Sequence, residues 1–390
     1  MKNKISNNRF ERSLIKHRKY VRFINYFFKI IGVVLVFLVL LEFFSFLIVT
    51  AYEFYGYNII NKGISDNRIR IDVYNDAEWA AQYFIEDKNS NKAEYYPYLE
   101  HRRIPNFKGE YINIDENSIR KTFFQCPDDN LKSIKIFVFG GSTVWGTGAR
   151  DIGTIPSFLS KYLCENEFKI EITNFGESGY TSTHDVFKLE LELKKGNIPD
   201  IVIFYEGAND VYSSYQNHDA GLPHNLQNRV EDFNSRNSVN LQNLFPNFRR
   251  IINEFFGKQT SFREYSNENL NLETANVYLG NLKIIKSLEE GYNFKSFFYW
   301  QPTIYTKKEL SYDEENKIER NLILGDDYKD VSELIKTSNE IRDLTQVFND
   351  KENTIFIDWV HISEEGNSII AKEMSDDLTN YLIENNINLA

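Results

Sequence analysis

Two segments of the sequence end in side chains that could break an ester bond together. Ser142 follows two glycines at the end of an apolar run, and Asp358 and His361 follow another apolar run near the C-terminus. A serine hydroxyl is a weak nucleophile until a histidine accepts its proton, and that histidine needs a carboxylate to orient it. Asp358 and His361 are three residues apart, so a helical turn would place them on one face. The pattern predicts a catalytic triad in which His361 activates Ser142 and Asp358 orients His361.

Two more residues could stabilise the negative charge that acyl transfer creates. Such reactions need hydrogen-bond donors aimed at the developing oxyanion. Gly179 lies just beyond a third apolar run, and Asn209 lies just beyond a fourth. Gly179 has no side chain, so a substrate could approach its N–H closely. The sequence predicts an oxyanion hole made of the N–H groups of Ser142 and Gly179 and the side-chain amide of Asn209.

These five residues need a framework that brings distant parts of the chain together. Short apolar runs rich in β-branched and aromatic residues predict strands that are buried on both faces, at 134–139, 170–175, 201–205, 295–300 and 354–358. Helical patterns alternate with them, at 154–165, 183–195, 272–290, 328–349 and 363–385. This alternation predicts an α/β fold with right-handed crossovers and a doubly wound, five-stranded parallel sheet. Ligands of such sheets bind at the carboxyl ends of the strands, where all five residues are expected.

Capping residues mark the starts of two of the predicted helices. Thr154 precedes the helix at 154–165, and Pro156 stands in its first turn. Ser363 precedes the C-terminal helix, and Glu364 and Glu365 place negative charge in its first turn.

The five residues lie in motifs that resemble those of the SGNH (GDSL-like) hydrolase superfamily. Ser142 lies in GGST, where the family more often has GDS, and Gly179 lies in GESGYTS. Asn209 lies in EGAND, which matches G-x-N-D, and Asp358 and His361 lie in DWVH, followed by ISEEGN. The resemblance covers about 134–385 and leaves 1–130 unexplained. It implies a three-layer, flavodoxin-like fold, an acyl-enzyme formed on Ser142, and no metal or other cofactor.

A narrower likeness concerns the cellular role. The phrases YINIDENSIRKT and FYWQPTIYTKKEL resemble those of membrane-anchored family members associated with bacterial surface polysaccharides.

A second fold has to be weighed against this resemblance. The α/β-hydrolase fold also has the chain order Ser, Asp, His, but its G-x-S-x-G motif would need glycine at position 144, which is Val144.

Several aromatic and histidine residues near the predicted site have a simpler interpretation. Trp145, Tyr205 and Trp300 could stack on a sugar ring, but packing in the core accounts for them as well. His184 opens a predicted helix, so we interpret it as a capping residue rather than a catalytic one.

The segment 30–52 predicts an uncleaved transmembrane helix. Its single charged residue is Glu42, and it is long enough to cross a hydrocarbon core of about 30 Å. Glu42 could make a polar contact in the membrane or be tolerated in its protonated form. Residues 1–29 hold nine Lys and Arg against one acidic residue, so they are predicted to stay in the cytoplasm. We therefore expect a single-pass protein of the cell (inner) membrane whose C-terminal body is extracytoplasmic.

Charge and cysteine content exclude some partners. The chain carries −11 overall while residues 1–29 carry about +8, so the body is strongly acidic, which argues against nucleic acid as a partner. Cys126 and Cys164 could form a disulfide outside the cytosol or remain free thiols. No Cys and His spacing is typical of a zinc site.

These observations predict four parts: a basic segment at 1–29, the membrane helix at 30–52, a membrane-proximal extension at 53–130, and a catalytic domain at 131–390. An Asn-rich insertion at 213–270 either roofs the site or forms an ordinary surface loop. The predicted function is an esterase that removes O-acyl groups, O-acetyl first among them, from a cell-surface or exported glycan. The alternatives are an O-acyltransferase with the same triad and a non-catalytic glycan-binding or assembly protein.

Overall fold

The computed structural model describes residues 2–55, 66–126, 133–226 and 267–387, and a few positions between 229 and 252. The chain divides into two compact units, which are described separately. One consists of residues 1–63 and 232–261, and the other of residues 64–231 and 262–390.

The first unit contains one long helix, α1 (Lys2–Tyr55). Its portion Lys16–Ala51 is long and apolar enough to cross a membrane. The carboxylate of Glu42 accepts hydrogen bonds from the backbone N–H groups of Asn247 and Phe248 and from the side-chain amide of Asn247. Glu42 therefore has polar partners from its own chain. Most of the predicted insertion at 213–270, including much of the helical piece near 245–256, lies outside the described residues.

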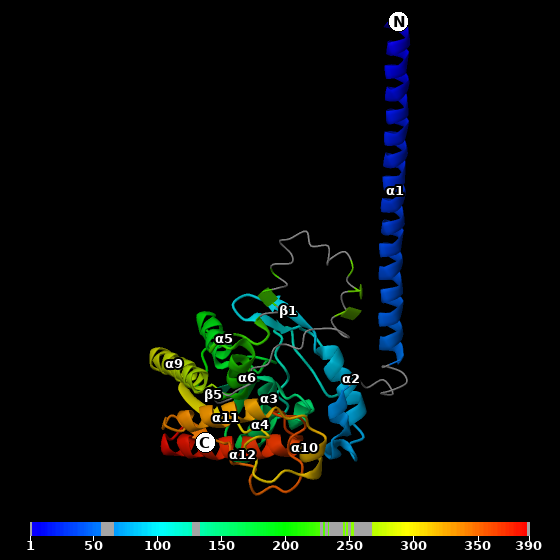
Figure 1. The fold of residues 1–390 in the computed structure, drawn as a ribbon. Coiled ribbons are helices and arrows are strands. Elements are labelled where there is room, and N and C mark those ends of the chain that lie inside the picture. The colour runs from blue at the N-terminus through cyan, green and yellow to red at the C-terminus, as the bar shows by residue number, and fades with distance from the viewer. Residues whose placement is uncertain are drawn as a thin grey trace. The chain divides into compact units, whose positions relative to one another are not determined.

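The second unit is built on a parallel sheet of five strands in the order β4-β3-β5-β6-β7. Figure 1 labels β5, the middle strand of this order, among the surrounding helices. The strands are β3 (Ile134–Gly140), β4 (Ile170–Asn174), β5 (Ile201–Glu206), β6 (Lys295–Trp300) and β7 (Ile341–Asp343). Neighbours pair in register, for example Val138 with Asn174 on one side and with Ile203 on the other. This confirms the predicted α/β fold with a five-stranded parallel sheet.

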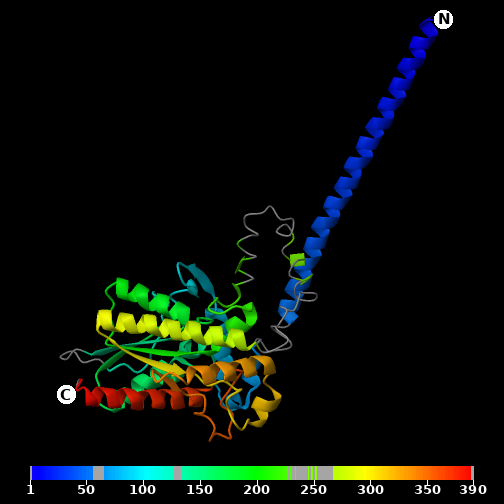
Figure 2. The same ribbon diagram turned by 60° about the vertical axis from the view of Figure 1, so that its left-hand side comes forward.

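Helices cover both faces of the sheet, so the fold has three layers (Figure 2). Alternating strand residues point to opposite faces: Ile136 and Val138 join one core, while Phe137 and Phe139 join the other. The first core is covered by α4 (Ile155–Glu165) and α12 (Glu364–Glu384). The second core is covered by α5 (Ser182–Lys194), α6 (Ala208–Asn217), α9 (Glu268–Tyr292) and α11 (Leu322–Ile335).

The predicted caps are present. Thr154 precedes α4 and its side chain accepts a hydrogen bond from the N–H of Ser157. Ser363 precedes α12 and accepts from the N–H of Gly366. Short helical pieces complete this unit: η2 (Asn67–Arg70), η3 (Asp72–Tyr74), α3 (Ser142–Trp145), η4 (Asp151–Gly153) and α10 (Tyr312–Asn316).

The sheet has five strands as predicted, but the prediction of a strand at 354–358 was wrong. The fifth strand of the sheet is β7, within the range 328–349 that was predicted as helix, and α11 ends at Ile335. The apolar run 354–358 is buried but belongs to no strand of the sheet. The carboxylate of Glu314 accepts the N–H groups of Ile355 and Phe356, so this backbone is satisfied without a neighbouring strand. The short edge strand β7 is only partly buried and has no apolar run to reveal it.

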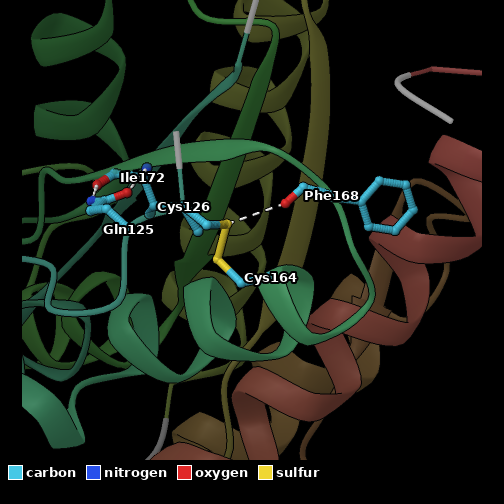
Figure 3. Close-up of a disulfide and its surroundings, with 5 residues drawn as sticks. All are labelled: Gln125, Cys126, Cys164, Phe168 and Ile172. Atoms are coloured by element: carbon cyan, nitrogen blue, oxygen red, sulfur yellow. Dashed lines mark hydrogen bonds between the residues drawn. A yellow bond between two sulfur atoms is a disulfide. The ribbon is translucent and has the colours of Figure 1, made fainter. Parts of the chain in front are cut away.

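Residues 66–126 belong to the same compact unit as the sheet. They form α2 (Ala80–Ser90) and an antiparallel hairpin of β1 (Ala93–Tyr96) and β2 (Glu100–Arg103). Their last residues run along the edge strand β4. There the side-chain amide of Gln125 both donates to the carbonyl and accepts from the N–H of Ile172, and a disulfide joins Cys126 to Cys164 at the end of α4 (Figure 3). The two cysteines are therefore paired, one of the two predicted states.

Candidate active site

The nucleophile candidate stands at a tight corner between strand and helix. Ser142 is the first residue of α3, directly after β3. A Cβ atom on Gly141 would lie 2.3 Å from the amide nitrogen of Asn209. The corner therefore needs a glycine before Ser142, because any side chain there would displace the amide predicted to hold the oxyanion.

The three predicted triad residues form one hydrogen-bonded chain. The Oγ of Ser142 lies 2.6 Å from Nε2 of His361, and Nδ1 of His361 lies 2.6 Å from Oδ2 of Asp358. A carboxylate can only accept, so Nδ1 carries the hydrogen and Nε2 is free to accept the hydroxyl proton. All three side chains are half-buried, which leaves the hydroxyl accessible to a substrate. The sequence-predicted residues thus meet although 216 positions separate Ser142 from Asp358.

The spacing of the acid and the base has a different origin from the one predicted. Asp358 and His361 lie in a bend that is closed by a bridge between Phe356 and Ile362, and not on a helix. The Oδ1 atom of Asp358 accepts the N–H groups of Val360 and His361 at 3.0 and 2.8 Å. Aspartate forms such turns readily, because its short side chain reaches the backbone two and three residues on.

Electrostatics keep Asp358 ionised. Burial alone would raise the pKa of this carboxyl, but the charge and hydrogen bond of His361 and the charge of Arg68 hold the pKa well below its ordinary value. The Nη1 atom of Arg68 lies 3.7 Å from Oδ2 of Asp358. The sequence did not point to Arg68, since it lies in a charged, Asn-rich segment far from every motif.

The predicted oxyanion donors also converge. The amide of Asn209 donates one hydrogen to the carbonyl of Tyr180 at 2.7 Å, which places the amide beside the Gly179 loop and keeps its second hydrogen available. Gly179 has φ +78°, a conformation that glycine adopts without strain. Within the described part of the chain, no acceptor faces the N–H of Ser142 or of Gly179. These donors are therefore free for the predicted contact with a reacting carbonyl oxygen.

A family model for GDSL-like lipases and acylhydrolases matches residues 136–374. This segment is more than half of the chain and contains all five site residues. The chain belongs to the GDSL-like lipase/acylhydrolase family. The first predicted resemblance is therefore confirmed, while the link to surface polysaccharides stays a prediction.

Three solved structures are similar to part of this chain at low identity. The lipase Lip_vut3 from a goat rumen metagenome is 12% identical with a TM-score of 0.38, and 62% of this chain and 96% of the lipase are covered. The acetyl xylan esterase AlAXEase is 15% identical with a TM-score of 0.36 and coverages of 63% and 99%. The psychrotrophic esterase EstA from Pseudoalteromonas sp. is 14% identical with a TM-score of 0.35 and coverages of 64% and 98%. Among curated proteins, none matches this chain.

A group of buried carboxyls surrounds the start of α6, next to Asn209, the predicted oxyanion donor of this GDSL-like domain. Asp210 accepts from the hydroxyl and the N–H of Ser182, and burial raises its pKa to about 6. Burial also raises the pKa of Asp185 to about 8 and that of Glu206 well above its ordinary value. Glu206 and Asp185 face each other, so they share protons rather than ionise together. The hydrogen bonds between Asp210 and Ser182 connect the first turn of α6, which carries Asn209, to the start of α5.

The hairpin of the extension contacts the GESGYTS motif, which contains Gly179. The carboxylate of Glu177 accepts the N–H of Arg103 at 2.9 Å, and the guanidinium of Arg103 donates to the hydroxyl of Ser178 at 2.8 Å. The hydroxyl of Tyr180 donates to the carbonyl of His101 at 2.6 Å. The loop that presents Gly179 is thereby fixed from outside the family segment.

The aromatic residues near the site divide into core and rim. Trp145, Tyr205 and Trp300 are fully buried, which confirms their interpretation as packing residues. The side chain of His184 closes a capping box with Thr181, as predicted. Half-buried rings form the rim instead: the ring of Tyr212 contacts the rings of His224 and Trp359, with centroids 5.1 and 5.5 Å apart.

Among the described residues, no three His, Cys, Asp or Glu side chains converge to hold a metal ion.

Proposed function

We propose that this protein is a membrane-anchored serine esterase that removes O-acyl groups, O-acetyl first among them, from a cell-surface or exported glycan. The observation that carries the chemistry is the unbroken chain of contacts from Asp358 through His361 to Ser142, with both distances at 2.6 Å. The glycan rests on the narrower likeness to polysaccharide-associated family members and on the predicted anchor.

In the proposed reaction, the Oγ of Ser142 attacks the ester carbonyl carbon while Nε2 of His361 takes the hydroxyl proton. The carbonyl oxygen becomes an oxyanion held by the N–H groups of Ser142 and Gly179 and by the amide of Asn209. The carbon–oxygen bond to the sugar then breaks, and His361 returns the proton to the departing sugar oxygen. Water, deprotonated by His361, attacks the acyl-enzyme, which releases the carboxylic acid and regenerates Ser142.

The proposed location places this chemistry outside the cytoplasm. The basic segment 1–29 favours a cytoplasmic N-terminus, because Lys and Arg flanking a membrane helix stay inside. The pairing of Cys126 with Cys164 agrees with this orientation, since disulfides persist mainly in oxidising compartments.

The test uses the full-length chain in detergent with 4-nitrophenyl acetate and with an acetylated oligosaccharide. We expect ester hydrolysis, labelling of Ser142 by a fluorophosphonate, and a loss of both in Ser142→Ala. Ser287→Ala is the matched control, because Ser287 lies on the exposed face of α9. Undiminished turnover in Ser142→Ala would sink the assignment.

A cellular measurement distinguishes hydrolysis from the predicted alternatives. Mass spectrometry of the surface glycan from a deletion strain should show more O-acetyl groups than the parent strain. A loss of O-acetyl groups would instead indicate an acyltransferase. A folded protein that the fluorophosphonate does not label would indicate a binding protein.

A further inference from the structure

One cation approaches the triad from outside the segment that defines the family. Arg68 belongs to η2, well before residue 136, where the family match begins. Its Nη1 atom lies 3.7 Å from Oδ2 of Asp358, the same oxygen that accepts the hydrogen bond from His361. An arginine at this position can act on the base through the acid without touching the substrate.

The guanidinium is held so that it presents Nη1 to Asp358. Its Nε atom donates to Asp66 at 3.0 Å, and its Nη2 atom lies 2.5 Å from the same carboxylate. A second carboxylate, that of Asp87, lies 3.4 Å from Nη2. The planar group also lies over the ring of Phe84, at 5.8 Å from its centroid. Two carboxylates and a ring therefore fix the orientation of a side chain that would otherwise have many rotamers.

We propose that Arg68 is a positioning residue, which orients the Asp358 carboxylate toward His361 and offsets part of its negative charge. This inference rests on the proposed function of the triad. Oδ1 of Asp358 is occupied by two backbone N–H groups, and Oδ2 is occupied by His361 and faces Arg68. Three hydrogen bonds and the facing cation together resist rotation of the carboxylate away from the imidazole.

The charge of Arg68 also adjusts the base. A carboxylate whose charge is not offset by a cation stabilises the protonated imidazole strongly. Transfer of the proton from His361 to the leaving sugar oxygen is then less favourable. A cation on the far side of the carboxylate weakens that stabilisation. Removing the cation should therefore slow the reaction, and the loss should be greatest at acidic pH.

Other charged groups nearby do not replace Arg68. Asp66 and Asp87 are negative and face the guanidinium rather than the imidazole. Glu364 is paired with Arg150 at 2.7 Å. The tyrosines around the acid are neutral at physiological pH; they are Tyr74, Tyr83 and Tyr305, and burial raises the pKa of each. Of the described groups around the acid, only Arg68 and His361 supply positive charge to Asp358.

The extension holds Arg68 in a rigid setting. The hydroxyl of Tyr74 donates to the carbonyl of Gly148 at 2.7 Å, and the N–H of Gly148 donates to the hydroxyl of Tyr83 at 2.7 Å. On the side of the acid, the hydroxyl of Thr354 donates to Asp72 at 3.0 Å. Residues 72–83 thus connect the loop after the nucleophile helix with the segment before Asp358, and Arg68 lies in the piece of chain just before them.

The experiment compares the full-length protein with Arg68→Gln and Arg68→Lys, using 4-nitrophenyl acetate from pH 5 to pH 9. In Arg68→Gln we expect kcat to fall about tenfold with KM little changed, because orientation is lost at a reacting group. The acidic limb of the kcat/KM profile should move up by about 0.5 to 1 pH unit. Arg68→Lys should keep the limb within about 0.3 unit, because the charge remains, while kcat falls about threefold, because an ammonium cannot contact Asp66 and Asp358 in the same way.

Arg342→Gln is the matched control. Arg342 also pairs with two carboxylates, those of Glu373 and Asp377. Both lie on α12, at least nine residues after its first residue Glu364, which is roughly 14 Å or more along the helix axis. If the pH profile and kcat of Arg68→Gln match those of Arg342→Gln, the inference about Arg68 is wrong. In that case the activity of the wild-type protein still supports the proposed function. If Arg68→Gln does not fold, Arg68→Lys decides alone: wild-type kcat in that variant overturns the inference. A wild-type protein without activity defeats the proposed function, and this inference with it.

Discussion

At the scale of single residues, the predicted chemistry depends on hydrogen-bond donors near Ser142 that are held in place. Asn209 donates one hydrogen of its amide to the carbonyl of Tyr180, and we predict that the other hydrogen binds the substrate oxyanion. The amide nitrogen also lies close to Gly141, where a Cβ atom would come within 2.3 Å of it. These contacts make Asn209 a preorganised donor, whose value lies in the transition state more than in the bound substrate.

Replacing Asn209 tests this argument. Asn209→Ala should lower kcat about 100- to 1,000-fold with a smaller change in KM, as removal of one oxyanion donor does elsewhere. Asn209→Asp keeps the shape but repels the oxyanion, so its loss should be at least as large. Steady-state kinetics with 4-nitrophenyl acetate measure both, and Asn316→Ala on the exposed surface of α10 is the control. A kcat within threefold of wild type in Asn209→Ala would remove Asn209 from the oxyanion hole.

The sequence could predict the site residues that directly follow a predicted strand. Ser142 and Asn209 follow directly after apolar runs, so a sheet was enough to bring them together. Arg68 was not predictable in this way, since its partner Asp358 is 290 positions away and no periodic pattern relates the two. Its only local signal is Asp66 two residues earlier, a pairing that is common on protein surfaces.

At the scale of elements, burial and strand formation are separate properties. Four apolar runs form sheet strands within a residue of their predicted ends, because each is flanked by a helix that covers it. The run 354–358 is equally apolar, but a side chain replaces the neighbouring strand. Glu314 accepts two of its N–H groups and pairs with Lys307, and the Lys307 and Glu314 side chains are fully buried. A hydrophobic run therefore predicts burial, and only tertiary contacts decide which backbone partner it finds.

Glu314→Ala should break this arrangement. The change leaves the ammonium of Lys307 buried without its partner and two N–H groups unsatisfied, so we expect a loss of about 3–5 kcal/mol in the free energy of unfolding. Urea unfolding of the full-length protein in detergent measures it. Glu315→Ala, a change at the exposed neighbouring residue, should stay within about 0.5 kcal/mol of wild type. Equal stabilities of the two variants would show that 354–358 is held by other contacts.

At the scale of the whole molecule, the extension contacts the family segment at several points around the candidate site. The extension supplies the brace for the Gly179 loop, the cation beside Asp358 and the last antiparallel contacts along β4. The disulfide fixes the end of this extension to α4 at a separation of 38 residues. Because β4 is an edge strand, covering it also protects it from pairing with other chains.

The redox state of the two cysteines then reports the compartment in which the body folds. If the body is extracytoplasmic, a maleimide added to the denatured protein from cells should label no cysteine before reduction and both after it. Cys164→Ser should leave one labelled thiol and lower the free energy of unfolding by about 4 kcal/mol, the chain-entropy value for a loop of this length. Ser287→Ala is the control for surface substitution and should change neither result. Two labelled thiols before reduction would place the body in a reducing compartment and reverse the predicted orientation of α1.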